Sequence, residues 1–422
     1  MFNKKKIYLI HAFFIWFLAV FIFFIEYLIR VSPSSMIKEL MISFDANNLQ
    51  ISSFSAFFMY AYVIMQIPVG LIVDKYGSKM SIVLSASLYA ICTYFFAFTY
   101  NIFIAQICRF FLGLTGAFAF IGTLKLCSNW FPRKTFSILV GLTQSVGMIG
   151  GALGSGIMGR LVKEHGWRQS LEIFAIILFI NVFFVLLFVK NKPQYYDCNK
   201  NQLLKDKYGR FNVKKNLLKI LRNKQTWLIA IISGLIYIPT GVLAELWGSF
   251  YLINVREFSS IESTDAISII FIGWALGGPF FGKISDIIGR RKTISIGVIN
   301  NIIILPIILF YPIQDKIIIY ILLFIYGILN SSSIVCYTSI SEQYSNKVQG
   351  TALGFANALA VLISAVFQQL IGFTIDFIRQ KRVINNYNDY IPYEIELSMS
   401  VIMISVFFSL IIFFFIKNTD DE

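Results

Sequence analysis

Apolar residues gather along the chain into long runs that are separated by short polar segments. A helix needs roughly 20 apolar residues to cross a hydrocarbon layer about 30 Å thick. The runs reach this length and lack the alternation of membrane strands, so they predict helices. Twelve membrane-spanning helices are predicted, at residues 8–37, 50–72, 79–98, 102–125, 136–158, 169–189, 227–252, 264–282, 293–311, 317–340, 351–377 and 396–416.

The distribution of Lys and Arg predicts how these helices are oriented. With the N-terminus placed inside, the inner loops and tails carry 24 of the 36 basic residues, and the outer loops carry nine. Basic residues favour the cytoplasmic side of a membrane. We therefore expect a multi-pass protein of the bacterial inner (plasma) membrane, with both termini in the cytoplasm.

One inner loop divides the predicted helices into two sets. Residues 190–225 hold eleven Lys or Arg residues against two Asp residues. Such a segment is typical of a linker that lies against anionic lipid, and we do not interpret it as a nucleic-acid site. We predict an N-terminal six-helix bundle at 1–189, a basic cytoplasmic linker at 190–225 and a C-terminal six-helix bundle at 226–422.

The composition supports a membrane protein and offers little for catalysis. Hydrophobic residues make up 57% of the chain and charged residues 14%, whereas soluble proteins average about 45–50% and about 25%. The five cysteines form no CxxC pair and the two histidines have no metal-ligand neighbours, so we expect no disulfide, metal or cofactor. No Ser–His or acidic cluster stands at catalytic spacing, and an enzyme is not predicted.

A charged ten-residue turn occurs twice, once in each half of the chain. A turn repeated at half the chain length predicts two homologous membrane halves, as transporters have. Its glycines permit a tight turn. Glycine, aspartate, glycine and a basic residue recur at the same spacing. The residues that we assign to the turns are Gly70, Asp74, Lys75, Gly77 and Lys79 in the first copy and Gly282, Asp286, Gly289, Arg290 and Arg291 in the second.

Both turns resemble the signature G-x-x-x-D-[RK]-x-G-[RK]-[RK] of the major facilitator superfamily, and the resemblance extends over essentially the whole chain. Ser78 and Ile287 each replace one basic residue of the signature. The resemblance implies an all-α membrane fold of twelve helices in two pseudo-symmetric six-helix bundles. It also implies that the turns lock and release the two bundles, and that helices 1, 4, 7 and 10 line a central cavity.

Helix 1 contains the most informative polar residues. Glu26 and Arg30 are four residues apart, share a helix face and can pair there. Pro33 is expected to bend the helix and to free carbonyl groups toward a polar cavity. The Tyr27-x-x-Arg30 segment is similar to helix 1 of the anion:cation symporter branch, in which the arginine binds an organic anion.

Two carboxylates that are usual in that branch are missing here, because their positions hold Ile29 and Gly116. Either Glu26 takes over proton coupling or the protein is a uniporter. Helix 4 offers Arg109 and Lys125. For Arg109 the alternative is a structural role, and Lys125 can also place its charge at the membrane surface.

The second half adds candidates from helices 7 and 10. Glu245 is either a paired residue or a cavity carboxylate that meets a cation or a proton. The complete set of candidate substrate or coupling residues is Glu26, Tyr27, Arg30, Arg109, Lys125, Glu245, Trp247, Asn330 and Tyr337.

Helix 5 carries a series of glycines that includes the pattern GxGxxG at residues 154–159. No strand precedes the pattern, so a dinucleotide site is not predicted. Small residues at this spacing favour close helix packing. The proline found in the antiporter motif of drug exporters is absent from this run, which disfavours drug efflux.

We predict a transporter that moves a small polar organic solute by alternating access, with an amino acid or short peptide favoured as substrate. In this hypothesis Arg30 meets a carboxylate, and Glu26 or Glu245 meets an amine. The first alternative is a proton-coupled organic-anion symporter, and the second is a non-transporting membrane sensor with the same fold. The expected partners are a small-molecule substrate, a proton in the coupled case and the lipid bilayer, with the protein a monomer.

Overall fold

The computed structural model describes the chain except residues 1, 132, 193–212, 345, 381–389 and 418–422, and every regular element in the described part is a helix. In the first half these are α1 (Phe2–Val31), the 3₁₀ turn η1 (Ser32–Ser35), α2 (Ile37–Phe44), α3 (Asn48–Tyr76), α4 (Ser78–Phe98), α5 (Ile102–Trp130) and α6 (Arg133–Phe188). Most of the predicted basic linker lies outside the described residues.

The second half is described from residue 213 onward. Three of its predicted spans are interrupted by short turns or breaks rather than forming single helices. Its elements are α8 (Val213–Leu221), α9 (Lys224–Val242), the π-helical turn η3 (Leu243–Trp247), α10 (Gly248–Arg256), α11 (Ser260–Ile288), α12 (Arg290–Phe310), α13 (Lys316–Asn330), η4 (Ser331–Ser333), α14 (Ile334–Glu342), α15 (Asn346–Gln380), α16 (Pro392–Met399) and α17 (Val401–Phe414).

Ten helical segments of the described part are long and apolar enough to cross a membrane. One of them, Leu139–Phe188, has 50 residues, and its path turns at Gly166, where φ is 80° and ψ is 158°. The chain is therefore a multi-pass integral membrane protein. Large apolar side chains such as Phe183, Ile303 and Phe407 are exposed, as expected of faces that contact lipid.

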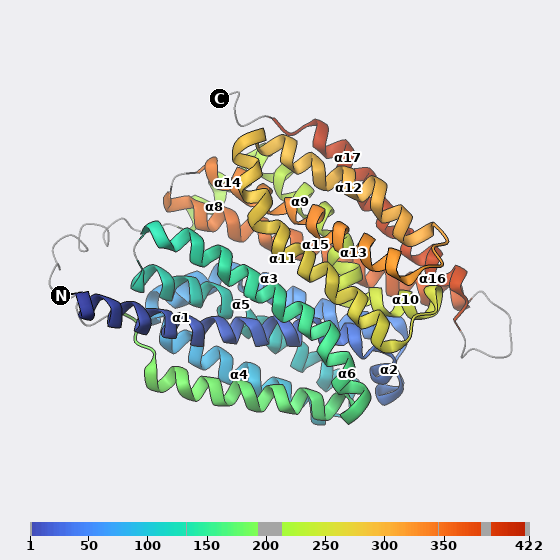
Figure 1. The fold of residues 1–422 in the computed structure, drawn as a ribbon, viewed down its shortest axis with the longest axis horizontal. Helices are drawn as coiled ribbons and strands as arrows, with labels where there is room; N and C mark the ends of the chain where they lie inside the picture. Colours follow the sequence, from blue (N-terminus) through green and yellow to red (C-terminus); the bar gives the residue numbers. More distant parts are fainter. Residues whose placement is uncertain (1, 132, 193–212, 345, 381–389, 418–422) are drawn as a thin grey trace.

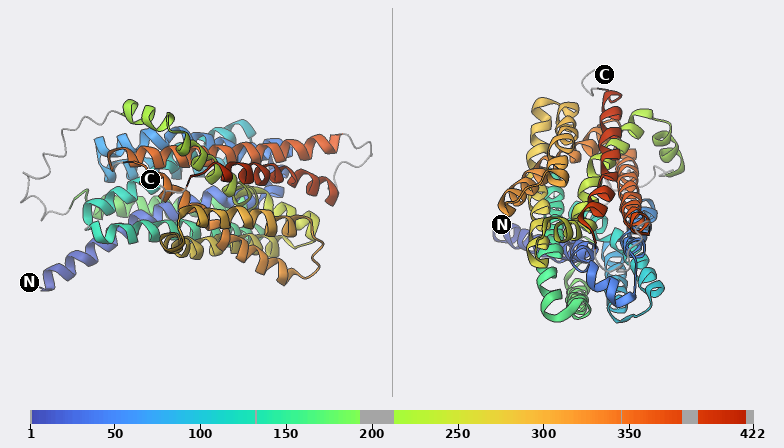
Figure 2. Two further views of the ribbon diagram at one scale, coloured as in Figure 1. Left: turned by 90° about the horizontal axis from the view of Figure 1, so that it is seen from above. Right: turned by 90° about the vertical axis from the view of Figure 1, so that its right-hand side faces the viewer.

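The helices of the first half and those of the second half form two layers of the molecule. In Figure 1 the blue-to-green helices lie below and the yellow-to-red helices lie above, and the right-hand view of Figure 2 shows the same division end-on. Within the first half α1 packs against α6, and α5 packs against α3 and α4. Between the halves, α3 packs against α15 and α6 against α11.

The two halves are joined by polar contacts at the predicted outer end. Asp376 of α15 accepts hydrogen bonds from the side-chain amide of Asn48 at 2.6 Å and from the backbone N–H of Leu49 at 2.9 Å. This carboxylate caps the first turn of α3, where the helix dipole favours negative charge. Arg160 of α6 forms two hydrogen bonds with Asp265 of α11, at 2.7 and 2.6 Å.

Glycines on the four helices that face the other half have different surroundings at the two ends. At the predicted outer end, a side chain added at Gly159 would collide with Thr264, and one at Gly372 would collide with Ser52. Toward the predicted cytoplasmic end, an added side chain would meet no described atom within 4 Å at Gly70, Gly141, Gly282 or Gly350. Close contact between the halves at these glycines is therefore found at the predicted outer end.

Both signature turns adopt the backbone that their glycines allow. Gly77 and Gly289 have φ of 85° and 93°, which is strained for other residues. Lys79 donates from its backbone N–H to Asn191 and from Nζ to the Leu186 carbonyl. The side chain of Asp74 lies outside the described part, so the locking role of the first turn stays a prediction.

The second turn is held by ion pairs within its own half. Arg290 pairs with Asp286 at 2.6 Å and with Glu342 of α14 at 2.7 Å. Asp286 is 65% exposed. In this structure the second turn thus contacts α14, and the locking role implied by the resemblance stays a prediction.

The glycine series of α6 packs against α1, as the spacing predicts. An added side chain at Gly150 would collide with the carbonyl of Phe24, and one at Gly154 would collide with the carbonyl of Leu28. Only glycine allows these two backbones to approach so closely. This close packing sets the position of the residues that follow in α1.

Candidate substrate site

Helix α1 ends at Val31, and the break is held in place by Arg109. Pro33 has no N–H to donate to the carbonyl of Ile29, so that carbonyl loses its helical partner. The guanidinium of Arg109 donates to the carbonyls of Ile29 at 3.3 Å and Arg30 at 3.2 Å, and to that of Phe54 in α3 at 3.0 Å.

This geometry corrects one expectation and settles the position of Arg109. The carbonyls freed near Pro33 were predicted to face a polar cavity, but two of them accept hydrogen bonds from Arg109 instead. Arg109 is only 1% exposed, and all three of its bonds are to backbone oxygens. It therefore stabilises the broken end of α1 and positions the backbone of Arg30 through the hydrogen bond to its carbonyl.

Arg30 lies at the contact between the two halves, and its partner is Glu245. Its Nη2 donates to Oε1 of Glu245 at 2.9 Å, and the two side chains are 7% and 1% exposed. The predicted pair between Glu26 and Arg30 is wrong. The spacing permits that pair, but η3 supplies a carboxylate from the other half that reaches the guanidinium directly.

Glu245 is presented by an irregular turn. The π-helical turn η3 interrupts the span formed by α9 and α10, and such π-turns are frequent at functional sites. The hydroxyl of Tyr237 donates to Oε1 of Glu245 at 2.7 Å and lies 3.5 Å from the hydroxyl of Tyr27. Tyr27, Arg30, Tyr237 and Glu245 thus form one polar cluster that spans both halves.

The ion pair uses only part of the bonding capacity of each partner. Nε of Arg30 and Oε2 of Glu245 are buried and find no hydrogen-bond partner among the described residues. A guanidinium can bind both oxygens of a carboxylate at once. A buried polar atom left without a partner costs about 1–3 kcal/mol. The site can therefore gain bonds if another carboxylate approaches Arg30.

Aromatic rings surround the guanidinium. Its central carbon lies 5.0 Å from the ring centre of Tyr27, 5.5 Å from that of Tyr62 and 5.8 Å from that of Phe58. Each such contact is worth about 0.5–2 kcal/mol, depending on burial. These rings hold Arg30 in place and provide faces against which a flat ligand can pack.

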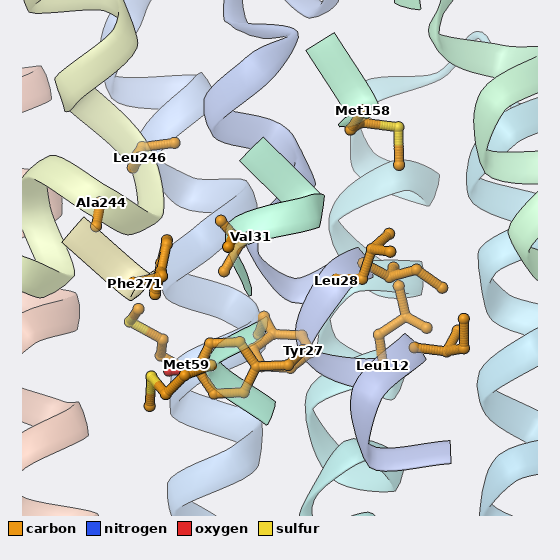
Figure 3. Packing of buried hydrophobic residues seen from close by; sticks show 14 of the residues in the cluster. Tyr27, Leu28, Val31, Met59, Leu112, Met158, Ala244, Leu246 and Phe271 are labelled. Carbon is orange, nitrogen blue, oxygen red and sulfur yellow. The ribbon is translucent and has the colours of Figure 1, made fainter. Parts of the chain in front are cut away.

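Apolar side chains of both halves pack beside the polar cluster. Figure 3 shows Tyr27 and Val31 of α1 beside Phe271 of α11 and the η3 residues Ala244 and Leu246. The rings of Tyr27 and Phe271 are 6.2 Å apart in an edge-to-face arrangement. Packed apolar residues of both halves therefore adjoin the polar cluster.

Some residues near Arg30 were not predicted from the sequence. Tyr62 and Tyr237 were missed, because a tyrosine in an apolar span is not distinctive by itself. The one available signal was the position of Tyr237, eight residues before Glu245 in the same span. Tyr337 was predicted, and its hydroxyl donates to Asn357 of α15 at 3.3 Å.

Two predicted residues lie inside the second half, in contacts unrelated to Arg30. Asn330 is fully buried; it donates to the carbonyl of Ile236 at 3.0 Å and accepts from Thr240 at 2.9 Å. Trp247 is also fully buried and donates to the carbonyl of Gln368 at 3.0 Å. We therefore leave both out of the candidate site.

Lys125 also lies apart from the cluster. It is half-buried on α5, sixteen residues beyond Arg109 on the same helix, which corresponds to about 24 Å of helical rise. That places it toward the predicted cytoplasmic end. The structure thus brings together Tyr27, Arg30 and Glu245 of the predicted set, and it does not bring Lys125 to them.

Glu26 faces the interior of the first half. It is 2% exposed, and its Oε1 has no hydrogen-bond partner within the described part of the chain. It lines a cavity of about 10 Å³ together with Ser85, Tyr89 and Thr115. A side chain added at Gly116 would approach Oε1 of Glu26 to 2.9 Å, so the glycine leaves the space that this carboxylate fills.

Comparisons with known proteins agree on one family. The model of the Major Facilitator Superfamily matches residues 15–369. The chain is 25% identical over 348 residues to the cis,cis-muconate transport protein of Acinetobacter baylyi, covering 81% of this chain and 82% of that relative. It is 24% identical over 297 residues to the hexuronate transporter of Escherichia coli, covering 65% of this chain and 67% of that protein.

Solved structures share the fold. The chain is similar to a bacterial homologue of the human lysosomal transporter Spinster, solved in an inward-facing and unoccupied conformation. The TM-score is 0.77, the sequence identity is 13%, and the superposition covers 96% of this chain and 97% of that structure. At this identity the similarity concerns the fold alone.

Proposed function

We propose, since the chain belongs to the Major Facilitator Superfamily, that this membrane transporter carries small organic acids by alternating access. The observation that carries the proposal is the position and state of Arg30. Its guanidinium lies buried between the two halves, and its Nε has no partner among the described residues. A carboxylate is the group that such a donor binds best.

The names of the relatives bear on the choice between the two predicted substrate classes. The muconate and hexuronate transporters are named for organic acids that carry no amine. The predicted preference for amino acids or short peptides has no support from them. We therefore prefer the alternative, an organic-anion transporter. The relatives are named as transporters, which also disfavours the sensor hypothesis.

The proposed topology has twelve spans and two bundles. The bend at Gly166 divides the segment Leu139–Phe188 into two crossings, and the 29-residue helix α3 supplies one further crossing beside the remaining segments. We keep the cytoplasmic termini, the basic linker, the bacterial inner membrane and the monomeric state as parts of the proposal. With that orientation, the close contact between the halves lies toward the outside.

Alternating access predicts that the close contact at Gly372 is needed for outer closure. Changing Gly372→Val forces a side chain against Ser52 and the Asn48 carbonyl, so we expect the protein to favour the outward-open state. The measurement is labelling of Ser52→Cys by a membrane-impermeant thiol reagent in a cysteine-free background, and labelling should rise at least severalfold. Gly350→Val on the same helix, where an added side chain meets no described atom, is the control. Equal labelling of both variants would contradict the assignment of the outer contact.

Glu26 is the residue that we propose for proton coupling. It is a buried carboxylate whose Oε1 lacks a described partner, and a charge that is buried without partners is costly, so such a group has reason to take up a proton. Gly116 gives it room at the position where the symporter branch usually has its helix-4 carboxylate. We propose that this carboxylate takes and releases the proton that accompanies the substrate.

Uptake into proteoliposomes tests the proposed function. D-glucuronate and cis,cis-muconate are the probes. The comparison solutes are D-glucose, which carries no charge, and L-alanine, which carries an amine beside its carboxylate. We expect an acidic exterior to stimulate uptake of at least one acid. Glu26→Gln should lose that stimulation and still exchange the acid, because the neutral amide cannot carry a proton. Uptake of L-alanine alone would contradict the proposal.

A further inference from the structure

The Arg30–Glu245 ion pair joins the halves of the molecule at a site that we propose for the substrate. It connects the end of α1 to η3 through a single hydrogen bond of 2.9 Å. One nitrogen of Arg30 and one oxygen of Glu245 remain buried and unbonded within the described residues. A pair that served only to stabilise the fold would be expected to satisfy both groups.

We propose that Glu245 is an internal ligand of Arg30, which a substrate carboxylate displaces. The inference rests on the proposed function, because it takes Arg30 as the substrate-binding residue. A free carboxylate can bind two nitrogens of the guanidinium, whereas Glu245 on its helical turn binds one. The incoming ligand therefore replaces a partial contact with a more complete one.

The displaced side chain has a partner in place. Tyr237 donates to Oε1 of Glu245 at 2.7 Å, and both groups belong to the same span of the second half. Glu245 can leave Arg30 and retain this hydrogen bond. The hydroxyl of Tyr27 lies 3.5 Å from that of Tyr237, so a ligand bound to Arg30 also meets two tyrosine hydroxyls.

Glu245 then determines which solutes bind. A neutral solute brings no charge to exchange for the carboxylate of Glu245, so the internal pair persists. A carboxylate can compete because it replaces one negative charge by another. Specificity of this kind arises from a competitor built into the site rather than from an added contact with the substrate.

The same exchange links binding to the contact between the halves. Without substrate, the Arg30–Glu245 pair connects α1 directly to η3. With substrate bound, Arg30 contacts the ligand instead, and the two halves are connected through the ligand. A ligand shifts a conformational equilibrium only through different interactions in the two states. The displacement of Glu245 provides such a difference.

Binding to Glu245→Gln tests the inference. The amide has nearly the same size and can accept from Tyr237, but it brings no charge to Arg30. By isothermal titration calorimetry of the purified full-length protein, we expect D-glucuronate or cis,cis-muconate to bind at least tenfold more tightly than to the wild type. D-glucose should give no signal with the wild type. The control is Glu262→Gln, which removes a carboxylate at the start of α11 that pairs with Lys316 of α13, and the affinity of this variant for the acids should equal that of the wild type.

The possible outcomes separate this inference from the proposed function. If an acid binds wild type and Glu245→Gln equally, or binds the variant more weakly, Glu245 is not an internal competitor and only this inference falls. If neither acid binds either protein, both the proposed function and the inference that rests on it are refuted. Should Glu245→Gln not fold, Glu245→Asp decides the matter: its shorter reach should also raise affinity, and an unchanged affinity would overturn the inference.

Discussion

Replacing Arg30 with alanine is expected to reduce uptake of organic acids about 30-fold or more. Truncating one partner of a buried, hydrogen-bonded charge pair costs about 2–5 kcal/mol of binding energy, and every 1.4 kcal/mol is about tenfold. The guanidinium is the group that binds the carboxylate in the proposed site. The measurement is initial uptake of D-glucuronate and cis,cis-muconate into proteoliposomes, together with binding in detergent.

Three variants show whether such a loss reflects binding rather than misfolding. Arg30→Lys keeps the charge but loses the planar set of donors, so we expect an intermediate loss. Arg222→Ala removes an exposed arginine beside α8 and should transport normally. The double variant Arg30→Ala/Glu245→Ala removes the carboxylate that the single change leaves unpaired. It should recover thermal stability without recovering uptake. Normal uptake by Arg30→Ala would refute the role given to Arg30.

Replacing Arg109 with alanine is expected to destabilise the protein strongly, whether or not substrate is present. The change removes the hydrogen bonds from one buried guanidinium to the carbonyls of Ile29, Arg30 and Phe54. Hydrogen bonds to charged groups contribute about 1.5–3 kcal/mol each. With roughly 2–4 °C of melting temperature per kcal/mol, the loss of three such bonds predicts a decrease of about 10 °C or more, measured by thermal denaturation in detergent without ligand.

The same measurement separates a positioning role from a substrate-binding role. Arg109→Lys can satisfy fewer of the three carbonyls, so its melting temperature should lie between those of wild type and Arg109→Ala. Arg222→Ala again serves as the control for the loss of an arginine. If Arg109→Ala melted like the wild type and failed only in uptake, Arg109 would have to contact the substrate, contrary to the structure.

Much of the fold follows from local patterns in the sequence. Apolar runs of sufficient length predict helices, because the backbone of a lipid-exposed segment must satisfy its own hydrogen bonds. The tight turns at Gly77 and Gly289 and the close helix packing of the glycine series were likewise expected from the residue types; that α1 is the helix packed against Gly150 and Gly154 was not. The breaks were harder to place. The sequence pointed to Pro33 in the first span, but the π-helical turn η3 has no comparable signal.

The candidate site was only partly predictable, since each polar residue in a span has several possible partners. Glu26 and Arg30 share a helix face, but a pair at this spacing contributes only about 0.2–0.5 kcal/mol in isolated helices. A buried contact with Glu245 can easily outweigh that preference. The partner stands 215 positions away in sequence, and no local rule identifies it. The same holds for Asn330, which proved to bind its own half.

The sequence by itself determined the class of protein, the two-fold repetition and the presence of charged groups at membrane depth, because these depend on residue type and spacing alone. Only the tertiary structure decided what those groups do. Packing of the two halves brings Glu245 to Arg30, leaves Glu26 in the space beside Gly116 and directs Arg109 to the broken end of α1. The physical reason is that a charge within a membrane protein must find a partner or a cavity, and which of these it meets depends on how distant helices converge.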